Sequence, residues 1–203
     1  GEKTPIAVLQ LFYQPDNMGV MAPIEAKHDF WASIAAGARG VLVFSYWHKR
    51  DGGGMLEGTW DAYCEEAAKI TGEERLGQVI LFGEPYEDLG AAVVSGPRMS
   101  APFVPYGYNH EIRYPSLTTR GWVHEGSLYV VAVNSAQRGL RAMLTGLPEG
   151  ATEAVALFEE AEAREANPEA DQQAAEGAEE GAGPAQRTVP INGGILQDSF
   201  GGL

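Results

Sequence analysis

The chain is predicted to combine an α/β part with an all-β part. Two near-continuous apolar runs, residues 6–13 and 40–46, are typical of parallel strands that are covered on both faces. From residue 91 onward, short β-prone runs alternate with Gly, Pro and Asn, which is typical of antiparallel strands joined by turns. The sequence therefore predicts an α/β domain over residues 1–86 and a β-domain over residues 87–203.

A helix is predicted between the two apolar runs. Pro23 suits the first position of a helix, and Glu25 places a carboxylate in its first turn, where the helix dipole favours negative charge. Apolar residues then recur at helical spacing, namely Ile24, Trp31, Ile34, Ala35 and Ala38. Strand, helix and strand together predict a right-handed βαβ crossover.

Two more helical pieces complete the predicted α/β domain. Thr59 is expected to cap a helix whose apolar face includes Cys64, and a second piece follows over residues 73–81. Cys64 is the only cysteine, so no intrachain disulfide forms, and its place on the apolar face predicts a buried thiol.

The β-domain is predicted to hold several short strands and one unstructured insertion. Residues 161–186 are rich in Ala, Glu and Gly and lack large apolar side chains, so they are expected to form a disordered acidic insertion. The spacing of the strands favours an antiparallel sandwich or half-barrel. The expected strands are residues 93–94, 118–123, 127–134, 141–144, 154–158, 187–191 and 195–200.

The charge of the chain excludes some partners. A net charge of −14 would be repelled by nucleic acid and by anionic membrane surfaces. No apolar run approaches the ~20 residues of a membrane span, and the first residues do not resemble a signal segment. Because the chain begins at Gly1 rather than Met, a removed leader stays open, and with it a secreted or periplasmic location.

Polar and aromatic side chains gather where the two apolar strands end. Gln10 and Tyr13 close the first run, and Tyr46, Trp47 and His48 close the second. The carboxyl ends of parallel strands are where ligands bind in α/β folds. These five residues are therefore the predicted substrate-binding residues.

The same stretch resembles a known enzyme family. Gln10, Pro23 and Glu25, with the runs 37–40 and 44–47, are similar to the last two βα units of (β/α)8-barrel glycoside hydrolases. The resemblance is to β-galactosidase-like enzymes and their uncharacterised relatives, and it covers residues 5–83 best. A weaker likeness at Trp122 and residues 128–134 is to the β-sandwich appended to such barrels. Together, the two likenesses imply two βα units of a TIM barrel followed by an antiparallel β-sandwich.

The resemblance also implies that part of the protein is missing from this chain. A (β/α)8 barrel needs about 250 residues, so the missing N-terminal barrel portion of the same protein is an expected partner. Retaining enzymes of this kind use two carboxylates ~5 Å apart, one of them after the seventh strand. If residues 6–12 are that strand, the nucleophile position holds no Asp or Glu. Either the catalytic pair lies in the missing strands, or the strand count is shifted, or the site is degenerate.

The resemblance implies a carbohydrate ligand. Trp47 offers an indole face and an N–H to a sugar ring, or it simply packs under the neighbouring loop. If side chains still alternate between the two faces of the strand at this point, only one of Tyr46 and Trp47 faces the site. Gln10 and His48 each offer hydrogen bonds to hydroxyls, or play no role in binding. The catalytic residues stay unidentified, and no motif indicates a metal or cofactor.

Two functions follow from these observations. The first is part of a glycoside hydrolase or hydrolase-like protein that supplies sugar-binding residues from the ends of its last two barrel strands. The second is a non-catalytic carbohydrate-binding or scaffold protein with a degenerate barrel site. Catalytic Glu residues at strand ends upstream would favour the first, and their absence would favour the second.

Overall fold

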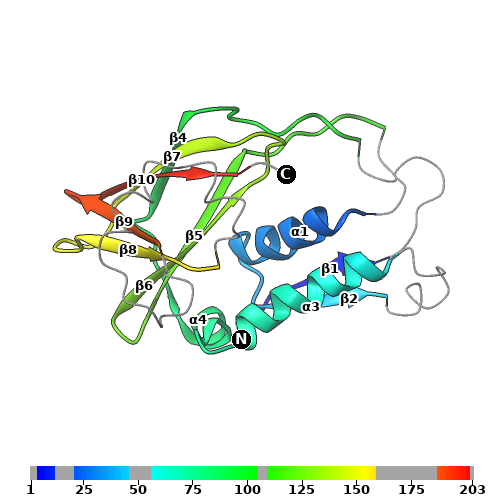
Figure 1. Ribbon diagram of the computed structural model, residues 1–203, viewed down its shortest axis with the longest axis horizontal. Coiled ribbons are helices and arrows are strands. Elements are labelled where there is room, and N and C mark those ends of the chain that lie inside the picture. The colour runs from blue at the N-terminus through cyan, green and yellow to red at the C-terminus, as the bar shows by residue number, and fades with distance from the viewer. Residues whose placement is uncertain (1–3, 12–20, 46–55, 105–108, 159–186, 202–203) are drawn as a thin grey trace, which may run out of the picture. The chain divides into compact units, whose positions relative to one another are not determined.

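A computed structural model describes residues 4–11, 21–45, 56–104, 109–158 and 187–201 (Figure 1). Contacts divide the chain into two compact units. Unit 1 comprises Gly1–Glu87 and Thr118–Ser135, and unit 2 comprises Asp88–Leu117 and Ala136–Gly202. The chain therefore leaves unit 1, enters unit 2, and returns to unit 1 for one hairpin before it completes unit 2. The predicted insertion over residues 161–186 lies outside the described residues.

Unit 1 begins with a parallel strand pair. Strand β1 (Ile6–Gln10) and strand β2 (Gly40–Phe44) are connected through helix α1 (Pro23–Ala35). Their register runs from Ile6 opposite Gly40 to Gln10 opposite Phe44. The parallel pairing predicted for these two runs is confirmed.

Helix α1 begins where its first residues predict. Pro23 lies in the first turn, and the Glu25 carboxylate accepts a hydrogen bond from the Ala22 backbone N–H at 2.8 Å. That bond satisfies one of the donors that a helix start leaves unpaired. The predicted apolar face is partly wrong, because Ile24 is exposed whereas Ala26 and Phe30 are buried.

Helices α3 (Glu57–Thr71) and α4 (Leu76–Phe82) follow. Thr59 does not cap α3 as predicted. It lies inside the helix, buried, and its hydroxyl donates to the Met21 carbonyl oxygen at 2.6 Å. The prediction of a buried Cys64 is wrong as well, because Cys64 is exposed.

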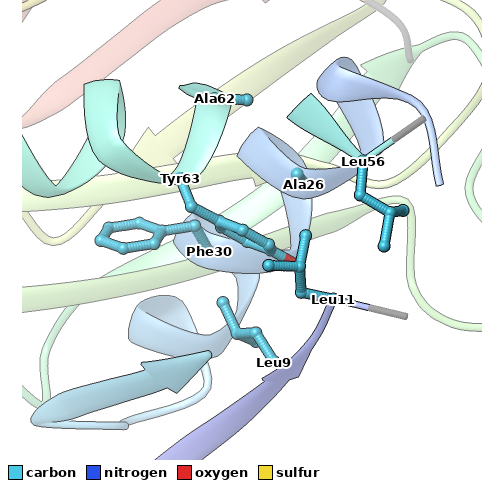
Figure 2. Close-up of a cluster of buried hydrophobic side chains, with 7 residues drawn as sticks. All are labelled: Leu9, Leu11, Ala26, Phe30, Leu56, Ala62 and Tyr63. Atoms are coloured by element: carbon cyan, nitrogen blue, oxygen red, sulfur yellow. The ribbon is translucent and has the colours of Figure 1, made fainter. Parts of the chain in front are cut away.

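The first core of unit 1 lies between β1 and two helices (Figure 2). Side chains from β1, α1, α3 and the residue before α3 converge there, so that both helices pack against one face of the β1–β2 pair. Apolar burial of this kind stabilises by about 25 cal/mol per Å² removed from water. Its members are Leu9, Leu11, Ala26, Phe30, Leu56, Ala62 and Tyr63.

A second sheet completes unit 1. Strands β3 (Glu84–Pro85), β5 (Leu117–His124) and β6 (Ser127–Asn134) pair in the order β3-β5-β6. The two-residue turn between β5 and β6 has positive φ at Glu125 and Gly126, as tight hairpins require. Helix α1 contacts β6. A second buried cluster joins this sheet to the helices and consists of Ile34, Val79, Ile80 and Trp122.

Unit 2 is built on one five-stranded antiparallel sheet. Its order is β4-β7-β10-β9-β8, and the strands are β4 (Gly90–Ser95), β7 (Leu140–Thr145), β8 (Glu153–Ala156), β9 (Arg187–Asn192) and β10 (Ile195–Phe200).

An ion pair ties two strands of this sheet together. Asp198 lies opposite the buried Ala142, and Arg187 binds both of its carboxylate oxygens, at 3.0 and 2.7 Å. Such a bidentate pair has the geometry that gives a salt bridge its strength and direction.

The predicted fold class, two TIM-barrel βα units followed by a β-sandwich, is wrong. The described residues are 41% strand and 24% helix, with three helices and largely antiparallel sheets. After α4 the chain does not add another parallel strand. It continues into β3, which pairs antiparallel with β5, and the β5–β6 hairpin packs within unit 1. The physical reason is that short alternating runs carry no information on which earlier element they will cover.

Candidate functional site

The carboxyl ends of β1 and β2 lie side by side. Beyond the last strand pair, the Leu11 N–H donates to the Phe44 carbonyl oxygen at 2.6 Å. The Ser45 N–H in turn donates to the Leu11 carbonyl oxygen at 3.2 Å. These two bonds hold Leu11 and Ser45 together just beyond the carboxyl ends of the two strands.

Gln10 lies on the face of the pair that points away from the helices. Its neighbours Leu9 and Leu11 are buried in the helix-covered core, and successive side chains of a strand point to opposite faces. Gln10 is half-buried and lies in register with Phe44, whose side chain is exposed on the same face. The Gln10 amide, which both donates and accepts hydrogen bonds, therefore stands beside an apolar ring at the carboxyl edge.

Tyr63 holds the backbone at this point. Its hydroxyl donates to the Gln10 carbonyl oxygen at 3.0 Å and lies 3.5 Å from the Met21 sulfur. Burial raises the pKa of Tyr63 above its ordinary value, and the negative charge of Asp29 raises it further. The hydroxyl consequently stays protonated and able to donate when the solution is made alkaline.

This raised pKa predicts a loss of stability at alkaline pH. The unfolded chain releases the Tyr63 proton near pH 10 whereas the folded protein retains it, so the free energy of unfolding falls as the pH rises above about 10. Tyr63→Phe should cost about 1 kcal/mol at pH 7 through the lost hydrogen bond. It should also flatten the fall between pH 10 and pH 11. Urea unfolding at pH 7, 10 and 11 measures both effects, and an equally steep alkaline slope in the variant would contradict the assignment.

Of the predicted binding residues, the structure places only Gln10. Tyr13, Tyr46, Trp47 and His48 lie outside the described residues. Their assignment to the site stays a prediction.

Two polar clusters of unit 1 were not predicted from the sequence, and the first surrounds a buried carboxylate. Glu66 of α3 is 1% exposed, and it accepts a hydrogen bond from the Trp31 indole N–H at 2.6 Å. The Lys69 ammonium lies 2.9 Å from its other oxygen, and that of Lys27 lies 4.0 Å from the same atom. Paired cations and a hydrogen bond offset the cost of burying the charge. The cluster joins α1 to α3, and its one local signal was the i,i+3 spacing of Glu66 and Lys69.

The second cluster centres on His28. Its Nε2 lies 2.9 Å from the Ser135 hydroxyl oxygen, and its Nδ1 lies 3.0 Å from a carboxylate oxygen of Asp29. The order of groups is that of an acyl-transfer triad. However, Asp29 follows His28 directly on α1 and is half-exposed, so solvent screens its effect on the imidazole. We assign the cluster to fastening α1 to the segment after β6, a contact across 107 positions that no local pattern could reveal.

Among the described residues there is neither a group of metal-ligating side chains nor a candidate membrane-spanning helix. Among them, no three His, Cys, Asp or Glu side chains come together as metal ligands would. Within the same part of the chain, none of the helices has the length and apolar character needed to cross a bilayer.

The fold and the site define a protein with two units: in one, two parallel strands covered by helices end at the same carboxyl edge, and the other is built on an antiparallel sheet. Comparison with known proteins found no matching family model, no matching curated protein and no matching solved structure.

Proposed function

We propose that this chain is the sugar-binding part of a carbohydrate-active, glycoside hydrolase-like protein. The binding site lies at the carboxyl edge of β1 and β2. The observation that supports this proposal is the parallel pairing of the two strands, whose register places Gln10 opposite Phe44 and so brings both carboxyl ends to the same edge. Ligands of open α/β sheets bind beyond the carboxyl ends of the strands.

The residue types at this edge suit a sugar. A pyranose ring presents hydroxyl groups around its rim and an apolar C–H face, so it needs both hydrogen-bonding groups and a flat apolar surface. Gln10 supplies an amide that donates and accepts, and the nearby sequence supplies Tyr13, Tyr46, Trp47 and His48. An indole or phenol combines an apolar face with a polar atom, which matches both parts of the sugar.

Strands β1 and β2 themselves contain no carboxylate. Residues 6–15 and 40–50 contain neither Asp nor Glu, and the neutral amide of Gln10 cannot attack an anomeric carbon. Glycoside hydrolysis ordinarily requires two carboxyl groups about 5–10 Å apart. In this proposal they come from the N-terminal portion of the same protein.

A second candidate function is a non-catalytic carbohydrate-binding or scaffold protein. The same lack of a carboxylate in residues 6–15 and 40–50 favours it. The two candidates differ in one measurable property, because only the first predicts that the full-length protein hydrolyses aryl glycosides.

The binding proposal predicts a clear effect of two substitutions in the full-length protein. Trp47→Ala should weaken the binding of β-linked galacto-oligosaccharides at least about tenfold, because removing an aromatic platform exposes the apolar face of the sugar to water. Gln10→Ala should weaken it about 2- to 10-fold through one lost hydrogen bond. Isothermal titration calorimetry measures both, and thermal melting shows whether each variant is folded.

The matched control is Gln197→Ala, which removes an exposed amide from β10 in unit 2. We expect it to bind sugar as the unchanged protein does. If Trp47→Ala and Gln10→Ala also bind like the control, the carboxyl edge of β1 and β2 is not the sugar site.

A further inference from the structure

Two hydroxyl groups on one side of α3 donate to backbone carbonyls of other elements of unit 1. Thr59 and Tyr63 are four positions apart, which places their side chains on the same side of the helix, and each is only 2% exposed. The Thr59 hydroxyl donates to the Met21 carbonyl oxygen at 2.6 Å. The Tyr63 hydroxyl donates to the Gln10 carbonyl oxygen at 3.0 Å. The two bonds therefore join α3 to residues that are 38 and 53 positions away in the sequence.

The Tyr63 bond fixes one peptide group from both sides. The carbonyl oxygen of Gln10 and the N–H of Leu11 belong to the same planar peptide unit. While Tyr63 binds the oxygen, the N–H donates to the Phe44 carbonyl oxygen at 2.6 Å. Figure 2 shows the oxygen of Tyr63 directed toward Leu11. A peptide plane that is held at both of its polar atoms cannot turn freely, so it restricts the ψ angle of Gln10 and the direction in which the Gln10 side chain leaves the sheet.

The Thr59 bond fixes a second peptide group in the same way. The Met21 carbonyl oxygen accepts the hydrogen bond from Thr59. The N–H of the same peptide unit is that of Ala22, and it donates to the Glu25 carboxylate at 2.8 Å. This second peptide group lies just before α1, whereas the first lies at the end of β1. Helix α3 thus holds the chain both where it leaves β1 and where it enters α1.

We propose that Tyr63 and Thr59 are positioning residues of the sugar site, which fix the backbone that carries Gln10 and that bounds the segment containing Tyr13. This inference rests on the proposed function for the identity of the ligand. Neither residue needs to touch the sugar, because both side chains are buried and both hydroxyls already bind carbonyl oxygens. Their contribution is preorganisation, since a binding group that is already fixed loses less freedom when the ligand arrives.

The alternative is that these bonds only stabilise the fold, because a buried hydroxyl needs a partner in any protein. Thr71 of the same helix illustrates the local solution, in which the hydroxyl donates to the Ala67 carbonyl oxygen of its own helix at 3.0 Å. The bonds of Thr59 and Tyr63 differ, because both of their acceptors bound one segment of the chain. That segment follows the strand end at which the sugar site is proposed.

Substitutions that remove only a hydroxyl test this inference in the full-length protein. Tyr63→Phe and Thr59→Val preserve the shape of the side chain, and Thr59→Ser retains the hydroxyl. We expect Tyr63→Phe and Thr59→Val each to bind β-linked galacto-oligosaccharides about 2- to 10-fold more weakly, the range that one ordinary hydrogen bond covers. Thr59→Ser should bind as the unchanged protein does. The matched control is Thr71→Val, which removes a hydroxyl from the same helix and should leave binding unchanged.

Two further readouts separate positioning from a simple loss of stability. Combined with Gln10→Ala, Tyr63→Phe should weaken binding by less than the product of the two single effects, because it acts through Gln10. Independent effects on stability would instead multiply. Hydrogen exchange, which needs no ligand, should be about 2- to 10-fold faster at the Leu11 amide in Tyr63→Phe and at the Ala22 amide in Thr59→Val, relative to the amides of α3.

The outcomes are distinguishable. Weaker sugar binding together with faster exchange at the two peptide groups would support the proposal. Faster exchange with unchanged sugar binding would overturn it, since the bonds would then only stabilise the fold. Unchanged exchange in both variants would overturn it whatever the sugar result. If the unchanged protein binds no carbohydrate while exchange still responds, the proposed function fails and the anchoring of the two peptide groups is supported.

Discussion

Replacing Trp122 with alanine should lower the free energy of unfolding of unit 1 by about 3–5 kcal/mol, the usual cost of truncating a buried tryptophan. Trp122 is 1% exposed and lies in the buried cluster with Ile34, Val79 and Ile80. The Arg120 guanidinium also lies 5.7 Å from the centre of its ring. The indole thus joins β5 to α1 and α4, and alanine would leave a cavity where three elements meet.

Urea unfolding, with hydrogen exchange of α4 as a local readout, measures this loss. The matched control is Phe82→Ala, since Phe82 is an aromatic residue of α4 that is 73% exposed. We expect the control to change stability by less than about 0.5 kcal/mol, as exposed substitutions usually do. Equal losses in the two variants would show that Trp122 does not hold unit 1 together.

Gly146→Ala should be the most damaging single-methyl addition in unit 2. The φ of Gly146 is +72°, where a side chain costs about 1–2 kcal/mol. A Cβ at this position would also collide with the backbone carbonyl oxygen of Asp88, and overpacking of this kind costs about 1–3 kcal/mol more. Because the obstacle is backbone rather than a flexible side chain, it cannot move aside cheaply.

Gly150→Ala separates the two costs. Gly150 has a φ of +88° in the same unit, and a Cβ there would meet nothing within 4 Å. We expect this variant to lose only the conformational cost, so Gly146→Ala should unfold at a clearly lower urea concentration. Identical midpoints would mean that the approach of Asp88 to Gly146 does not constrain the fold.

The local elements followed from short-range patterns. The strand at Ser127–Asn134 begins and ends where the alternation of the sequence predicts, and the parallel pairing of Ile6–Gln10 with Gly40–Phe44 is confirmed. The start of α1 at Pro23 is another such case, because a helix start depends on a few neighbouring residues. Each of these features depends on side chains within a few positions of one another.

The candidate site was predictable only in part. The position of Gln10 at the end of its strand could be foreseen from the apolar run, and so could the edge on which it lies. The hydrogen bond from Tyr63 to the Gln10 carbonyl oxygen could not, since it joins residues 53 positions apart. The burial of Glu66 under Trp31 is a similar case, because a helical glutamate next to a lysine is typical of a solvated surface.

The predicted fold class was wrong because it, too, depends on contacts between residues distant in the sequence. The β5–β6 hairpin has the pattern of any antiparallel hairpin, and nothing within it indicates that it belongs to the unit of α1 rather than to that of β7. Local propensity, charge and the order of strands and helices are properties of neighbouring residues, so they can be read along the chain. Which faces meet, which carboxylate is buried and which apolar face stays bare depend on contacts between distant residues, and only the packed chain decides them.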